Sequence, residues 1–465
     1  MSLSLSPAEV VARYRWRPDL DLLFDPRRGV FHRADTHTAV RMVELAMAGN
    51  TAEQITTTVA AQYGADPTVV AADVSALFAQ LADPVAPDGD ASPFIGVDKR
   101  FDELLPFPLR MEFELTAVCN WNCGFCYNVW KIDPDLSDSD VRKVIRGLPA
   151  KHMPVETAVR ALDECAANGC FIVRYSGGET LLHPDALDII DHGGSLGLYQ
   201  VVFTNGHFVT PAVAQRMAAA NVRCALVSLH GDRDTHNRLA GHKMAYDRAV
   251  NAMEILLDAG IDVVAETTLV RDNVAGVLEI IRDVYDRGVR QVGVMRYVPT
   301  GKNDEEYAVP QSMMLPLMAD IDRLTATDCP GVKVGWPCGQ KFCTSAEDTP
   351  LTADDPTLAL RFTQLTGHCE SGLVWGSVSF DGRLRNCPHS NVYFGHVDQG
   401  IAAPWQTLTS TVAAAVAPRS SCSGCAVAGI CRGGCHLGSF LQEPGGAPAL
   451  LPLPTARRHG QDALT

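Results

Sequence analysis

The chain has 465 residues, more than a single hydrophobic core usually serves, so two to four domains are expected. Its composition, with 46% hydrophobic and 20% charged residues, is that of a globular protein. A formal net charge of −15 argues against a nucleic-acid-coating protein. The sequence shows neither a signal-peptide pattern nor an apolar stretch of about 20 residues, so we expect a cytoplasmic protein without a membrane partner.

The first 83 residues are expected to form a small unit with one hairpin and three helices. Two apolar stretches flank a turn at residues 25–29, which indicates the hairpin. The three helices are predicted to begin near Asp35, at Thr51, where Gln54 completes a capping box, and near Pro67. Residues 84–104 are rich in Pro, Gly and Asp and are typical of a linker.

Strands and helices alternate over residues 105–310. The predicted strands are 109–115, 170–176, 199–205, 223–229, 262–270 and 291–297, with helices at 155–168, 211–220, 243–259 and 274–287. This alternation indicates the α/β class, with a parallel sheet closed or nearly closed as a partial (β/α)6 TIM-like barrel. Residues 311–440 are rich in Cys and Gly and are expected to be held by metal, and 441–465 form a flexible tail.

Fifteen cysteines need an explanation, because stable disulfides are rare in a reducing compartment and clustered cysteines point to metal. Four stand apart in apolar or helical context and are expected to be small buried side chains: Cys165, Cys170, Cys224 and Cys329. The others gather in an early triplet and a C-terminal group.

The triplet Cys119, Cys123 and Cys126 follows the first barrel strand, and loops after strands build the active site of such barrels. Three thiolates suit either an iron–sulfur cluster with one open iron or a structural zinc. Gly177-Gly178-Glu179 follows the second strand, where a sharp turn brings backbone close to a ligand. With Phe125 before the last cysteine, residues 105–310 resemble the radical SAM superfamily.

This resemblance implies an enzyme whose [4Fe-4S] cluster binds S-adenosyl-L-methionine (SAM) and cleaves it reductively to a 5′-deoxyadenosyl radical. The 177–179 turn would receive the SAM amino group, and Phe125 would pack near the adenine. Ser228 and Arg238 match positions that often contact the ribose and the carboxylate; an ordinary strand-end hydroxyl and a solvated charge are the alternatives. No catalytic residue beyond the cluster and the SAM site is expected, and an electron donor such as flavodoxin or ferredoxin is implied.

The C-terminal cysteines resemble the SPASM extension, which in relatives holds two auxiliary [4Fe-4S] clusters. The resemblance assigns Cys369, Cys387 and Cys435 to one cluster with Cys343 or Cys338, and Cys422, Cys425 and Cys431 to the other. The final cysteine of that pattern is missing. The outer cluster therefore has a different ligand or an open iron, or is absent, so one or two auxiliary clusters are expected; structural zinc is the alternative.

Residues 12–83 resemble a PqqD-like peptide-recognition element, a winged-helix fold that binds the leader of a ribosomally made peptide. The resemblance rests on Arg17-Pro18, the strand 29–34 and the helical segment 51–64. It implies that a leader adds as a strand beside the hairpin, against the third helix. A generic winged helix, used for packing or DNA binding, is the alternative, although the acidic chain disfavours a nucleic-acid partner.

The three resemblances together predict a radical SAM/SPASM peptide maturase. It would modify a ribosomally synthesised precursor peptide, delivered by its leader, and form a thioether or carbon–carbon cross-link. The alternatives are a peptide epimerase, a SPASM-type dehydrogenase acting on a non-peptide metabolite or a protein residue, and an iron–sulfur regulator without enzyme activity.

Overall fold

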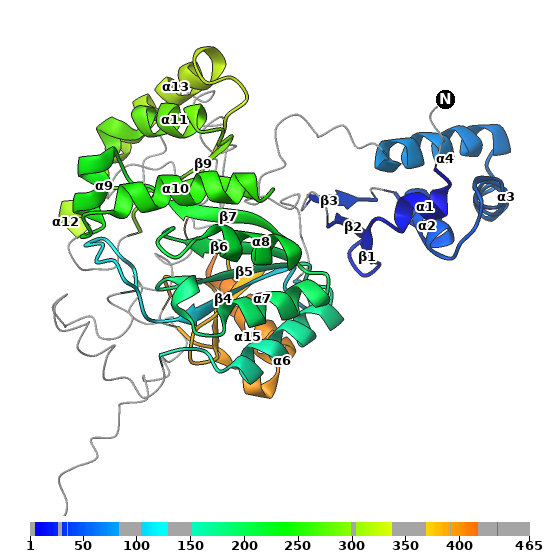
Figure 1. The fold of residues 1–465 in the computed structure, drawn as a ribbon. Coiled ribbons are helices and arrows are strands. Elements are labelled where there is room, and N and C mark those ends of the chain that lie inside the picture. The colour runs from blue at the N-terminus through cyan, green and yellow to red at the C-terminus, as the bar shows by residue number, and fades with distance from the viewer. Residues whose placement is uncertain are drawn as a thin grey trace, which may run out of the picture.

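The structure is a computed structural model, and Figure 1 shows its ribbon. It describes residues 5–26, 30–34, 36–82, 104–128, 151–298, 304–336, 369–390, 392–416 and 435. The proposed ligands Cys338, Cys343, Cys422, Cys425 and Cys431 lie outside the described residues, as do the tail and almost all of the linker.

The N-terminal unit contains the predicted hairpin and three helices. Its elements are α1 (Pro7–Val11), β1 (Arg15–Arg17), β2 (Leu22–Asp25), β3 (Val30–Arg33), α2 (His37–Met47), α3 (Ala52–Tyr63) and α4 (Pro67–Ala82). The capping box predicted at Thr51 and Gln54 forms. The sequence analysis missed α1 and β1, because five and three residues are too short to show a period.

All six predicted barrel strands are confirmed. They are β4 (Arg110–Thr116), β5 (Ile172–Gly177), β6 (Tyr199–Thr204), β7 (Val222–Ser228), β8 (Asp262–Leu269) and β9 (Gln291–Arg296), in consecutive parallel order. The sheet extends further than predicted. The short β10 (Lys333–Gly335) adds beside β9, and β11 (Trp375–Val378) adds in parallel beside β4. An antiparallel pair, β12 (Arg383–Arg385) and β13 (Gly395–His396), completes the edge beyond β11.

Helices cover the outer face of this sheet (Figure 1). They are α6 (Val155–Ala167), α7 (Ala186–Ser195), α8 (Pro211–Ala219), α10 (Ala245–Asp258), α11 (Val277–Asp286), α13 (Gln311–Thr327) and α15 (Ala402–Ala415). Two short helices, α9 (Arg233–Leu239) and α12 (Asp304–Tyr307), contact residues 121–125 instead. The 3-10 turns are η1 (Thr180–Leu182), η2 (Val274–Gly276) and η4 (Val397–Gln399). Alternation along β4 sends Met111, Phe113 and Leu115 toward the helices. Glu112 and Glu114 therefore point to the interior, which carries charged side chains although the strands are rich in apolar residues.

The N-terminal hairpin closes the barrel at the end where its strands begin. The Phe24 ring stacks on Phe171, with centroids 5.1 Å apart and planes 2° from parallel. Arg17 donates to the carbonyl oxygen of Gly169 over 2.9 Å, and Arg15 donates to that of Leu196 over 2.8 Å. Because these acceptors precede β5 and β6, the hairpin lies opposite the loops that follow the strands. Figure 1 shows the unit on that side.

The four isolated cysteines are buried, as predicted: Cys165, Cys170, Cys224 and Cys329. Within the described part of the chain, no helix is long and apolar enough to cross a membrane.

Candidate functional site

The three triplet cysteines lie on the loop that leaves β4. Burial and the charges of Cys126 and Cys119 raise the pKa of Cys123. The three thiols therefore interact electrostatically. The loop is held from the α9 side, where the N–H of Asn122 donates to the Ala240 carbonyl over 2.9 Å. Three thiols on one backbone loop, near enough to interact electrostatically, fit the cluster that the sequence implies.

The alternative, a structural zinc site, would need ligands that converge on one ion. Among the residues that the structure describes, no three His, Cys, Asp or Glu side chains lie close enough together to hold a single metal ion. A four-iron cluster spreads its ligands over several irons, so its cysteines need not converge on one point.

The glycine turn after β5 lies directly on the cysteine loop. The N–H of Gly178 donates to Thr116 O over 2.7 Å, and that of Glu179 donates to Val118 O over 2.8 Å. A Cβ on Gly178 would collide with the Val118 carbonyl, and a Cβ on Gly177, whose φ is +135°, would collide with that of Thr116. The two glycines are therefore required for the close approach of this turn to the loop that carries Cys119.

The Glu179 carboxylate faces the end of β6. Oε1 accepts from Thr204 Oγ1 at 2.7 Å and from the Leu181 N–H at 3.1 Å, while Oε2 accepts from the Asn205 N–H at 2.7 Å. Burial raises the pKa of this carboxyl to about 6, although these hydrogen bonds favour the ionised form. With both oxygens engaged, the Glu179 side chain holds the turn against the end of β6. The predicted contact of the 177–179 turn with the SAM amino group stays a prediction.

Asn205 joins this turn to the cysteine loop. Its Nδ2 donates to Asn120 Oδ1 over 2.8 Å and lies 3.8 Å from Cys119 Sγ. The N–H of Trp121 is a second donor to that sulfur, at 3.4 Å. Hydrogen bonds to ligand sulfurs tune a cluster. The structure adds Asn205 to the residues that contact the proposed ligand Cys119.

Phe125 on the cysteine loop is buried against Leu239, Val270 and Tyr297. Its ring meets His230 edge-on, with centroids 5.0 Å apart and planes at 90°. His230 Nδ1 accepts from the Thr268 N–H at 3.2 Å, and burial lowers the His230 pKa to about 4, so the ring is neutral at pH 7. Its predicted contact with adenine stays a prediction, and the aromatic neighbour His230 is an addition from the structure.

Ser228 and Arg238 have different surroundings. Ser228 ends β7 on the interior face, beside Glu266 of β8. Arg238 forms an ion pair with Asp272, and each side chain is about half exposed, at 55% and 51%. Exposed ion pairs of this kind are common on protein surfaces. The predicted contacts of both residues with SAM stay predictions.

A serine links Cys369 to the residue that precedes Cys387. Cys369 Sγ lies 3.1 Å from Ser371 Oγ, to which Asn386 Nδ2, beside Cys387, donates over 3.4 Å. Cys435 is also described, but the upstream ligand of its proposed cluster, Cys343 or Cys338, and the three cysteines of the other cluster are not. The assignment of auxiliary ligands therefore stays a prediction.

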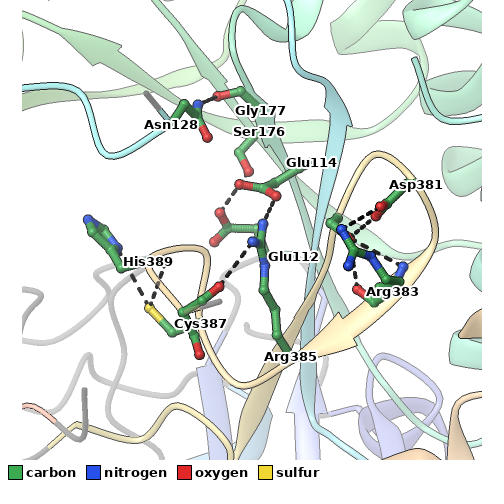
Figure 2. A network of polar contacts seen from close by, with 12 residues as sticks. Glu112, Glu114, Asn128, Ser176, Gly177, Asp381, Arg383, Arg385, Cys387 and His389 are labelled. Atoms are coloured by element: carbon green, nitrogen blue, oxygen red, sulfur yellow. Dashed lines mark hydrogen bonds and ion pairs between the residues drawn. The ribbon is translucent and has the colours of Figure 1, made fainter. Parts of the chain in front are cut away.

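A network of polar contacts connects the cysteine loop with the Cys387 loop, as Figure 2 shows. Two residues after Cys126, Asn128 Nδ2 donates to the Gly177 carbonyl over 2.6 Å. Below it, Glu114 of β4 and Arg385 of β12 form a fully buried ion pair. His389 Nδ1 lies 3.6 Å from Cys387 Sγ.

Most of these contacting residues could not be predicted from the sequence. Their one available signal was position, since Asn205 directly follows β6 and Asn128 follows the last cysteine of the triplet. The ion pair between Glu114 and Arg385 could not be predicted, because a charged residue in a strand does not indicate which distant residue it will contact.

Comparisons with known proteins agree with this geometry. Residues 113–284 match the Radical SAM superfamily, and residues 22–83 match Coenzyme PQQ synthesis protein D (PqqD). These matches agree with the two resemblances that the sequence showed over residues 105–310 and 12–83.

Similar proteins cover different shares of the chain. The AdoMet-dependent heme synthase of Methanosarcina barkeri is 32% identical over 199 residues, 43% of this chain and 53% of that protein. The mycofactocin maturase MftC of Mycobacterium tuberculosis is 25% identical over 360 residues, 75% and 84% of the two chains. The chain thus spans about half the length of the heme synthase but most of the maturase.

A solved structure covers almost the whole chain. SuiB of Streptococcus suis, solved bound to the precursor peptide SuiA, aligns over 95% of this chain and 98% of that one, with a TM-score of 0.65 and 14% identity. At this identity the likeness shows a shared fold alone.

Proposed function

We propose that this protein is a radical SAM peptide maturase. It would bind a [4Fe-4S] cluster through Cys119, Cys123 and Cys126, cleave SAM reductively, and form a thioether or carbon–carbon cross-link in a ribosomally synthesised precursor peptide. When bound, the cluster supplies the electron that breaks the S–C5′ bond of SAM. The 5′-deoxyadenosyl group then takes one hydrogen atom from the peptide.

The observation that carries the proposal is the pairing of the cysteine loop with a PqqD-like unit on one barrel. The 177–179 turn, held by Glu179 and the β4 backbone, leaves backbone groups to orient the SAM amino group. Phe125 and His230 bury the side of the loop that faces β7, which helps to exclude water from a reactive site. The names of MftC and SuiA, a maturase and a precursor peptide, support a peptide as substrate.

The N-terminal unit offers an edge for a leader peptide. In its sheet, ordered β1-β2-β3, one side of β3 has no neighbouring strand among the described residues. The N–H of Ala34 donates to the Asp21 carbonyl over 2.9 Å. Because successive N–H groups of a strand point to opposite sides, the N–H of Arg33 points away from β2. An extended leader would pair with such outward groups, which is strand addition.

A cross-link removes two hydrogens from the peptide. One leaves as part of 5′-deoxyadenosine, and the other leaves as a proton together with one electron. An auxiliary iron–sulfur cluster near Cys369 and Cys387 would accept that electron and pass it to a flavodoxin- or ferredoxin-type carrier. The proposal assigns this role to the C-terminal cysteines.

The direct test uses the reconstituted, reduced enzyme with SAM and synthetic peptides encoded by short open reading frames beside the gene. The proposal expects 5′-deoxyadenosine and a peptide lighter by about two hydrogens per event. A peptide of unchanged mass that takes up deuterium from solvent would mean epimerisation instead. No peptide change with any such sequence would contradict the proposal.

Removing the N-terminal unit is a poor test of leader binding, because Phe24 and Arg17 close the barrel. A sharper variant is Arg33→Pro, which deletes the outward N–H and keeps the ladder bonds to β2. We expect it to weaken peptide binding about fivefold, the effect of about one hydrogen bond, with an unchanged melting temperature.

A second candidate is a dehydrogenase that acts on a non-peptide metabolite, with the N-terminal unit only structural. The 32% identity to a heme synthase favours it. For such an enzyme, Arg33→Pro would leave turnover of the true substrate unchanged, and no peptide would bind.

A further inference from the structure

Four glutamates surround the barrel interior and the turn above it, and three of them have side-chain or backbone partners. Ser176 Oγ donates to Glu112 Oε1 over 2.7 Å, Arg385 pairs with Glu114, and Glu179 holds the end of β6. The fourth, Glu266, is 7% exposed, and its Oε2 is buried without a hydrogen-bond partner. Within the described part of the chain, no hydrogen bond or ion pair reaches its carboxyl group.

Glu266 lies beneath the proposed SAM site. It pairs in register with Ser228 of β7 and with Gly293 of β9, and register partners in a parallel sheet point to the same face. Gly293 leaves that flank without a side chain. One pleat further along β8, about 7 Å away, the N–H of Thr268 donates to His230, whose ring packs on Phe125.

An unpartnered buried carboxyl is a stability cost, because it loses water without a replacement. Burial raises the pKa of Glu266 to about 8, although the positive charge of Arg174 across the interior lowers it in part. The group is therefore neutral at pH 7 and presents one O–H donor beside one carbonyl acceptor. An amide has the complementary pair, an N–H beside a C=O, whereas an ammonium ion would need the ionised carboxylate.

We propose that Glu266 binds an amide group of the peptide substrate through two hydrogen bonds and holds the reacting residue below SAM. The inference rests on the proposed function and names the part of the peptide that this site recognises. It makes Glu266 a substrate-contacting residue that the cysteine and glycine motifs do not include.

Two variants separate this role from a structural one. Glu266→Gln keeps a donor beside an acceptor, and Glu266→Leu keeps the bulk and removes both. We expect the Leu variant to bind a fluorescein-labelled precursor peptide about tenfold more weakly and to form less product per 5′-deoxyadenosine, while the Gln variant stays within about threefold of wild type. The Leu variant should melt no lower than wild type, because an unpartnered buried acid is gone.

Thr267→Val is the matched control on the opposite face of β8. It removes the hydrogen bond from Thr267 Oγ1 to the Leu229 carbonyl, 2.6 Å long, and should lower the melting temperature without changing the product ratio. A structural role for Glu266 predicts the same pattern for Glu266→Leu, and that outcome would overturn the inference.

Two further measurements test whether the group bound by Glu266 is an amide. If Glu266→Gln loses as much peptide affinity as Glu266→Leu, the group bound by Glu266 is a cation, and the proposal is wrong. Infrared difference spectra of wild type minus Glu266→Gln, without peptide, should show a neutral carboxyl band at pH 7; its absence would also contradict it. If wild type makes no peptide product while the band is present, the proposed function fails instead.

Discussion

The Tyr127 ring lies over the His389 ring, with centroids 4.3 Å apart and planes 33° from parallel. Tyr127 directly follows the last cysteine of the triplet, and His389 follows Cys387 by two residues. The contact therefore joins the loop of the proposed SAM cluster to a loop of the proposed auxiliary site. The buried pair Glu114–Arg385 lies beneath the same junction (Figure 2).

Breaking that ion pair on one side should destabilise the protein strongly. Arg385→Met leaves the Glu114 charge buried and unpaired, which costs about 3–5 kcal/mol, whereas Glu114→Gln combined with Arg385→Met removes both charges. We expect the single variant to melt well below wild type and the double variant to recover most of the loss. Equal melting temperatures for the two variants would show that the pair does not stabilise the junction.

The glycine turn should tolerate no side chain. Gly178→Ala would push the turn away from the Val118 carbonyl, so we expect lower iron content after reconstitution and at least about tenfold weaker SAM binding. Gly276→Ala is the control, because a Cβ there meets nothing within 4 Å and its φ is −94°. Normal iron content and SAM affinity in Gly178→Ala would contradict the role given to this turn.

The N-terminal hairpin should stabilise the barrel itself. Phe24→Ala removes the ring stacked on Phe171, at a cost of about 3–5 kcal/mol, and should speed hydrogen exchange in β5 and β6. Val43→Ala, in the separate core of the N-terminal unit, should speed exchange only within that unit. If Phe24→Ala leaves β5 and β6 protected, the hairpin is not part of the barrel core.

The free energy of unfolding should decrease as the pH rises, because of Glu266. Its pKa is raised from about 4.5 to about 8, so the neutral form favours folding fully below pH 4.5, and this contribution is lost as the pH rises toward 8. Arg174 is the charged group that acts on it; its strand neighbours Ser228 and Gly293 do not titrate in this range. The melting temperature of Glu266→Gln relative to wild type should rise between pH 5 and 8, by at least about 2 °C. A constant difference would mean an ordinary pKa for Glu266.

The sequence predicted the barrel strands because buried parallel strands are long apolar runs between turn residues. It missed α9, whose seven residues are mostly polar, and β11, which joins β4 from far along the chain. The cysteine triplet and the 177–179 turn were visible as local patterns. Contacts such as Asn205 with Cys119, and Tyr127 with His389, were not, because they depend on which strand ends become neighbours.

The central claim is that SAM cleavage at the Cys119, Cys123 and Cys126 site takes a hydrogen atom from a peptide. The most direct measurement is mass spectrometry of 5′-deoxyadenosine formed with a precursor peptide that carries carbon-bound deuterium in its core residues. We expect one deuterium in 5′-deoxyadenosine from wild type, and no 5′-deoxyadenosine from Cys123→Ala. If 5′-deoxyadenosine carries no deuterium while the peptide is modified, the hydrogen atom does not come from the peptide core and the proposed function is wrong.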